Sequence, residues 1–92
     1  MTASFVVPCD HPSLPGHFPG HPIVPGVVLL DQALTMVAGA RTISRIERAR
    51  FLRPVMPGAV VEVSWRETTT ESLEIVCQVD GLPVLRCQAW FL

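Results

Sequence analysis

The apolar residues follow two periods in turn, and the change between them separates a helical stretch from a β-rich one. Residues 27–40 are apolar on nearly every side, with Asp31, Gln32 and Thr35 as the polar exceptions, which predicts a helix buried almost all round. From residue 43 onward apolar and polar positions alternate, which predicts strands over 44–53, 59–67, 73–79 and from Pro83 to the C-terminus. A short β-like run, residues 5–7, precedes the helix.

Turn residues mark the boundaries between these elements. Residues 54–58 contain two prolines and a glycine and predict a turn, while Asp80-Gly81 predicts a tight hairpin. Residues 8–26 contain six of the nine prolines, so a stiff, shaped loop is expected there. The expected fold class is therefore α+β, with a meander of four antiparallel strands wrapped around one central apolar helix. This is the hot-dog arrangement.

Size and composition predict one domain, residues 1–92, that associates with a second copy of itself. A chain of this length buries only about 60–65% of its surface on folding. Because 49% of the residues are apolar, the excess favours a homodimer or a higher oligomer, in which a partner covers the rest.

The basic residues are concentrated in one window. It holds a single acid, Glu47, and five arginines: Arg41, Arg45, Arg48, Arg50 and Arg53. Because the net charge of the whole chain is −1, this pattern favours a local acidic partner over nucleic acid, which usually requires a basic domain. A solvated edge strand, whose charges prevent aggregation, explains the window equally well.

The cysteines and the N-terminus indicate a cellular location. Cys9, Cys77 and Cys87 lack Cys-x-x-Cys spacing, which favours reduced, buried thiols in a cytoplasmic protein over a disulfide or a metal site. The first residues resemble no signal peptide, and the longest apolar run is too short to span a bilayer. We therefore expect a cytoplasmic protein without a membrane partner.

Two residues are candidate acid–base groups. His17 lies in the proline-rich loop, and Asp31 interrupts the apolar helix, where a carboxylate is costly to bury unless it is paired or functional. Thr35 is four residues beyond Asp31 on the same helix face, so its hydroxyl could hydrogen-bond the carboxyl. From the residues alone, a purely structural turn role for His17 stays open.

A metal site built from the histidines is the alternative use of this loop. His17 and His21 are four residues apart, but Pro19 and Pro22 prevent a helix from stacking them, and no cysteine or carboxylate completes a set with His11. We expect no metal and no other cofactor.

The start of the predicted helix offers a site for a developing negative charge. The N–H groups of Gly26 and Val27 have no acceptor within a helix, and the helix dipole reinforces them. Glycine at this position allows close approach of a substrate.

These residues carry a family resemblance. The segment Gly16-His17-Phe18-Pro19-Gly20-x-Pro22-x-x-Pro25-Gly26, followed by Asp31, resembles the active-site motif of the 3-hydroxyacyl-[acyl-carrier-protein] dehydratases of fatty-acid synthesis. The stretch Ala49-Arg50-Phe51-x-Arg53-Pro54-Val55-x-Pro57-Gly58 resembles the second recurring stretch of that family. With the hairpin, the likeness covers almost the whole chain from Phe5.

The resemblance implies an active site at the interface of a hot-dog dimer, with His17 of one chain facing Asp31 of the other. Neutral His17 would remove a proton from C2 of a carrier-bound 3-hydroxyacyl thioester. Asp31, kept protonated by an apolar environment, would protonate the departing hydroxyl. The product would be a trans-2-enoyl thioester of fatty-acid, polyketide or aryl-polyene synthesis.

The remaining positions complete the candidate site. Phe18 and Thr35 would join Gly26 and Val27 in binding substrate, and the five arginines would dock the acidic acyl carrier protein. An aspartate as the acid matches the family branch that can also isomerise the double bond.

Two departures keep alternatives open. Thr35 occupies a position where the family often has glutamine, and the chain lacks most of the N-terminal segment of typical members. A hot-dog acyl thioesterase and a non-catalytic acyl-binding module are the two other candidate functions.

Overall fold

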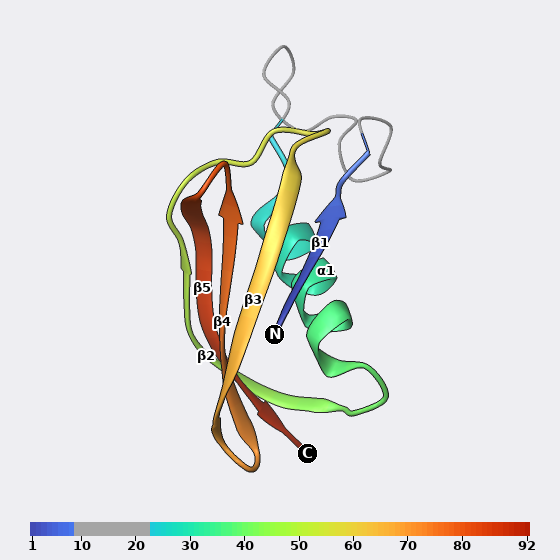
Figure 1. Cartoon of the computed structure of the whole chain (residues 1–92), viewed down its shortest axis with the longest axis vertical. Coiled ribbons are helices and arrows are strands. Elements are labelled where there is room, and N and C mark those ends of the chain that lie inside the picture. The colour runs from blue at the N-terminus through green and yellow to red at the C-terminus, as the bar shows by residue number, and fades with distance from the viewer. Residues whose placement is uncertain (9–22) are drawn as a thin grey trace.

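A computed structural model describes residues 1–8 and 23–92 of the chain. Within them, one helix lies against an antiparallel sheet of five strands (Figure 1). The elements are β1 (Thr2–Val6), α1 (Gly26–Ala38), β2 (Ile43–Phe51), β3 (Val60–Thr69), β4 (Ser72–Val79) and β5 (Leu82–Phe91). The predicted α+β class is confirmed, and each expected strand has a counterpart within a few residues of its expected bounds.

The order of the strands corrects the expected meander. The sheet runs β1-β3-β4-β5-β2, so only β3, β4 and β5 follow one another as a meander. Strand β2 pairs with β5, at the opposite end of the sheet from β1, and residues 52–59 cross over to β3 (Figure 1). The predicted turn at residues 54–58 therefore lies in a connection between distant strands, because proline and glycine end a strand without specifying its next partner.

The alternation predicted for the last three strands is confirmed by the core. Inward positions such as Val63, Ile75 and Leu85 are each 0% exposed, and Val63 pairs with Cys77, which is also 0% exposed. The predicted Asp80-Gly81 hairpin is confirmed as well. Asp80 has φ 52° and Gly81 has φ 78°, two consecutive positive values that match the twist of the flanking strands.

Helix α1 is less buried in this chain than its sequence suggested. Leu29 and Ala33 are the fully buried helix residues, at 2% and 0% exposure, and half-buried neighbours such as Leu30 and Leu34 pack against the core beside them. On the opposite side Val27 is 72% exposed. In the single chain the prediction of burial almost all round fails along one stripe, Val27, Asp31 and Thr35, because one curved sheet does not close around a helix. The helix ends at Gly39, whose φ of 58° suits a residue without a Cβ.

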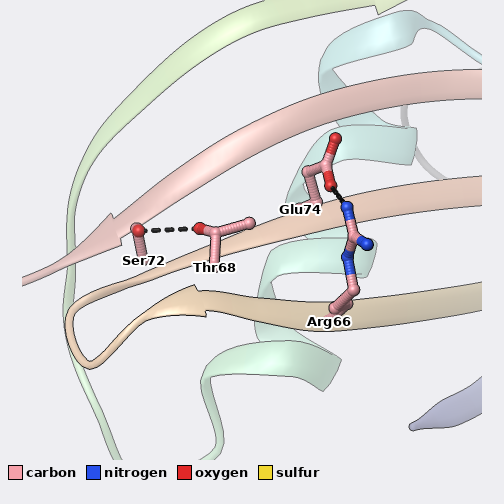
Figure 2. Close-up of polar contacts among 4 residues, drawn as sticks. All are labelled: Arg66, Thr68, Ser72 and Glu74. Carbon is pink, nitrogen blue, oxygen red and sulfur yellow. Dashed lines mark hydrogen bonds and ion pairs between the residues drawn. The ribbon is translucent and has the colours of Figure 1, made fainter.

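Polar groups stabilise the β3–β4 hairpin and the outer face of the sheet. The Ser72 hydroxyl, although buried, hydrogen-bonds the hydroxyls of Thr68 and Thr69 at 2.8 and 2.7 Å. Arg66 forms an ion pair with Glu74 on the neighbouring strand, on the face of the sheet turned away from α1 (Figure 2). In the described ranges, no helix has the length and hydropathy needed to cross a membrane.

Candidate active site

An apolar cavity of about 650 Å³ lies where α1 begins. Two segments form it: residues 23–26 with Leu29, and residues 51–55, which end β2 and start the crossover. The main-chain N–H of Val24 donates to the carbonyl of Val55 at 2.8 Å, which ties the two segments together. The cavity can therefore hold an apolar ligand beside the helix N-terminus.

Gly26 has a close neighbour that leaves no room for a Cβ unless that neighbour moves. A Cβ at this position would lie 2.9 Å from Cε1 of Phe51, well inside the usual contact distance of two carbon atoms. From the sequence we expected this glycine to allow a substrate to approach closely. The structure shows that a protein side chain, the Phe51 ring, already uses the space, while Gly26 and Phe51 both line the cavity.

The helix N-terminus presents donors beside this cavity. The N–H groups of Val28 and Leu29 both donate to the carbonyl of Pro25, at 3.0 and 3.2 Å. Within the described ranges the N–H groups of Gly26 and Val27 have no such main-chain acceptor, as expected for the first residues of a helix. They are suited to an oxyanion, because the helix dipole favours negative charge at this end.

Asp31 lies on the open side of α1, away from the cavity of its own chain. It is exposed, as is Thr35. At roughly 100° per residue, its side chain is turned about 200° from that of Leu29, which lines the cavity. The single chain therefore does not supply the apolar surroundings expected for the acid. The Thr35 hydroxyl donates to the main-chain carbonyl of Asp31 at 2.8 Å, so the suggested bond to the carboxyl is not formed.

The other residues of the predicted motif lie outside the described ranges. These are His17 and Phe18, together with His11 and His21 of the alternative metal site. In residues 1–8 and 23–92, no three histidine, cysteine or acidic side chains gather in a group able to hold a metal ion.

The five arginines of the basic window do not gather at one place. Arg41 lies just before β2 and Arg45 near its start, and their guanidinium groups stack on the rings of Phe91 and Trp90 at 3.7 and 4.6 Å. At the other end of β2, Arg53 lines the cavity. Because β2 is at an edge of the sheet, the edge-strand interpretation of the window agrees with the topology.

The remaining two arginines share a different site. Arg48 and Arg50 line a separate hollow on the outer face of the sheet, of about 450 Å³. The cavity and this hollow are therefore lined by different members of the window.

Two core thiols lie within the sheet, outside the cavity lining. Burial, with the charge of Cys87 as a smaller cause, raises the pKa of the Cys77 thiol from its ordinary 9.0 to about 12. Burial raises the pKa of Cys87 to about 11. Both are therefore unreactive at neutral pH.

Sequence reasoning missed the role of residues 51–55 as a cavity wall. A signal was present, since Phe51-x-Arg53-Pro54 belongs to the second stretch that resembles the dehydratases. No residue pattern indicated that Phe51 lies against Gly26, because the two are 25 positions apart and meet only in the folded chain.

Comparison with known proteins gives two curated relatives and one solved structure of note. A 3-hydroxyacyl-[acyl-carrier-protein] dehydratase FabZ of Syntrophotalea carbinolica is 37% identical over 97 residues, covering 91% of this chain and 60% of the relative. The bifunctional enzyme LpxC/FabZ of Chlorobaculum tepidum is 32% identical over 87% of this chain and 19% of that protein. The chain thus spans less than two thirds of either relative.

The solved structure is the dehydratase heterocomplex ApeI:P from Xenorhabdus doucetiae. A chain of it matches with a TM-score of 0.75 at 23% sequence identity, covering 98% of this chain and 84% of that one. This likeness confirms the hot-dog fold. The family model described as ApeI-like, ApeI dehydratase, matches residues 1–81. On this match over most of its length, the chain belongs to the ApeI-like dehydratase family.

Proposed function

We propose that this chain, as one domain over residues 1–92, dehydrates 3-hydroxyacyl thioesters on an acyl carrier protein to trans-2-enoyl thioesters. The observation that carries the proposal is the apolar cavity at the N-terminus of α1, in a chain of a dehydratase family. An acyl chain fits a cavity lined by apolar side chains, and the thioester oxygen would meet the N–H groups of Gly26 and Val27.

The proposed chemistry divides between two side chains. His17 takes the proton from C2, and the negative charge that develops on the thioester oxygen is stabilised at the helix N-terminus. The C3–O bond then breaks, Asp31 gives its proton to the departing hydroxyl, and water leaves. Phe18 and Thr35 are proposed to line the substrate path, Phe18 because it belongs to the motif that resembles the family and Thr35 because it lies on the same helix face as Asp31.

We further propose that each site is built from two chains. Asp31 lies on the open side of α1, while the cavity of its own chain lies on the sheet side near Leu29. A second copy covering that open side would bury apolar surface such as Val27 and bring Asp31 to the cavity of the partner. It would also supply the apolar surroundings that a carboxyl acting as an acid requires.

A different protein, in place of a second copy of this chain, is the other candidate for the partner. The matched solved structure is named as a heterocomplex of ApeI with a second protein, which suggests a related dehydratase chain in place of a second copy. Sedimentation of the purified chain distinguishes these partners, because a homodimer forms without any other protein.

We place the enzyme in the cytoplasm, since the thiols of Cys77 and Cys87 are free.

The test of the activity uses 3-hydroxyacyl and 2-enoyl thioesters as substrates. Formation of the enoyl product supports the proposal. Release of free thiol would indicate a thioesterase, and binding without turnover would indicate an acyl-binding module. The substitutions His17→Ala and Asp31→Asn should each lower turnover by at least about 10²-fold, the scale of one acid–base group.

The test of the two-chain site mixes these two inactive variants. After subunit exchange, one of the two sites in a mixed dimer holds both intact groups, so activity should return. If exchange is demonstrated and activity stays absent, both groups of a site belong to one chain.

A further inference from the structure

The outer face of the sheet carries a basic hollow that the proposed chemistry does not use. It has a volume of about 450 Å³ and lies across β2, β5 and β4. Three exposed arginines line it: Arg48 and Arg50 from β2, and Arg86 from β5. Arg86 lies outside the arginine-rich window of the sequence, and only the pairing of β2 with β5 brings it there.

The arrangement of these arginines is unfavourable for the isolated chain. Arg50 and Arg86 are directly opposite each other in the β2–β5 ladder, where like charges destabilise a sheet. Arg48 lies at a bulge in the same ladder with φ 55°, a conformation that few residues other than glycine adopt readily.

Nearby acids are engaged with other arginines. Glu74 also lines the hollow but is ion-paired with Arg66, as Figure 2 shows. Glu47 is ion-paired with Arg45 at 3.2 Å. These are the ion pairs within the described part of the chain, so Arg48, Arg50 and Arg86 keep positive charge available there for a partner.

The other arginines of the window contact groups of their own chain. Arg41 and Arg45 stack on aromatic rings of β5. Arg53 donates to the carbonyl of Pro83 at 3.3 Å. The window therefore divides into residues that stabilise β2 against β5 and residues that face the hollow.

We infer that this hollow is the docking surface for the acidic carrier protein, with Arg86 as a contact residue that joins Arg48 and Arg50. The inference rests on the proposed function, which requires a carrier. The three arginines that line the hollow are exposed, which suits the carboxylates of a protein surface better than a buried small anion.

The position of the hollow also suits this occupant. Arg50 and Phe51 are consecutive in β2, and consecutive side chains of a strand point to opposite faces of the sheet. Arg50 lines the hollow, and Phe51 lines the cavity proposed for the acyl chain. A carrier on the outer face would therefore be separated from the cavity by the thickness of one edge strand.

The test compares two double variants of equal net charge. Arg50→Glu with Arg86→Glu reverses the charge of the hollow, and Arg41→Glu with Arg45→Glu reverses two arginines outside it. For each, kcat/KM is measured on a carrier-bound 3-hydroxyacyl substrate and on a short uncharged thioester. The ratio of kcat/KM on the carrier-bound substrate to kcat/KM on the short thioester reports docking, because a change in folding or in chemistry lowers both values equally.

We expect the hollow variant to lower this ratio about tenfold at low salt, with the loss shrinking as salt screens the interaction. The variant outside the hollow should lower it no more than about twofold, since long-range steering by net charge is the same in both. An equal fall in the two variants would overturn the inference, as would an unchanged ratio in the hollow variant.

Carrier binding measured by titration calorimetry separates this inference from the proposed function. A wild-type chain that turns over neither substrate refutes the dehydratase proposal. If that chain still binds the carrier and the hollow variant does not, the docking surface stands. A chain that does not bind the carrier refutes the docking surface. Where Arg50→Glu with Arg86→Glu fails to fold, Arg50→Gln with Arg86→Gln removes the charges at similar size and should weaken carrier binding in the same direction.

Discussion

The contact between Gly26 and Phe51 allows a stability prediction that isolates one pair of residues. Replacing Gly26 with alanine places a Cβ 2.9, 3.0 and 3.1 Å from three ring carbons of Phe51. Carbon atoms normally approach to about 3.5–4.0 Å, so the ring must move by roughly 0.5–1 Å. Phe51 is 51% exposed and can swing toward solvent, which limits the cost.

Two terms of opposite sign set the magnitude. Full burial of a phenylalanine contributes about 1.5–3 kcal/mol, so displacing a half-buried ring costs about 1 kcal/mol. Alanine in place of glycine in a helix stabilises by up to about 1 kcal/mol, and by less in its first turn. We therefore expect Gly26→Ala to destabilise the chain by about 0.5 kcal/mol, and to stabilise it by about 0.5 kcal/mol when Phe51→Ala is also present.

The assay is a double-mutant cycle by urea unfolding, followed by the fluorescence of Trp65 and Trp90 at one fixed protein concentration. The expected coupling of about 1 kcal/mol is larger than the additivity error of about 0.3–0.5 kcal/mol. Gly39→Ala is the control. Its cost comes from a φ of 58° with no atom within 4 Å of the added Cβ, so Phe51→Ala should not change it. If Gly26→Ala has the same effect in both backgrounds, the contact does not explain this glycine.

Three further outcomes follow from contacts described above. Arg50→Glu alone should raise the free energy of unfolding by about 0.2–1 kcal/mol, because it replaces a like-charge pair with an attractive pair to Arg86; urea unfolding at low salt measures this gain. Ser72→Ala should cost about 0.5–1.5 kcal/mol, the net contribution of a hydrogen bond, since the exposed hydroxyls of Thr68 and Thr69 lose this partner and bond water instead; a change in midpoint below about 1 °C would contradict that role. The thiols of Cys77 and Cys87 should resist alkylation at pH 8, which peptide mapping can show. Because the pKa of each thiol is higher in the folded chain than its ordinary value, the protonated thiols favour the folded state below pH 9, and this contribution declines as the pH rises toward 11–12.

The parts of the fold predicted from sequence are those encoded by neighbouring residues. Strands β3 to β5 alternate because each has one face in the core, and the Asp80-Gly81 turn has the positive φ values that its residue types favour. The position of β2 was not predictable in this way. Its partner is decided by packing over a long stretch of chain, and the residues of its following turn are compatible with either a hairpin or a crossover.

The candidate site likewise has parts that neighbouring residues predict and parts that only the folded chain brings together. The helix that carries Asp31 and the donors at Gly26 follow from the local pattern, and the structure agrees with both. The open side of α1 was misjudged because its apolar pattern does not distinguish burial by the sheet of its own chain from burial by a partner. The opposition of Arg50 and Arg86, two of the arginines in the inferred docking surface, depends on strand register and has no counterpart in the linear sequence.

The pairing of β2 with β5 has a consequence for the order in which the chain can fold. The Ser44 hydroxyl donates to the carbonyl of Trp90, 46 positions later, and β5 also supplies the ladder partner of β4. During synthesis, α1 and β2 leave the ribosome well before the strand that both β2 and β4 need. Such long-range contacts slow folding, because the loop must close before they form. Nascent chains arrested before Leu82 should therefore keep both edges of β2 unpaired, and pairing with the ten-residue strand β5 covers one of those edges, which lowers the tendency of β2 to pair with other chains.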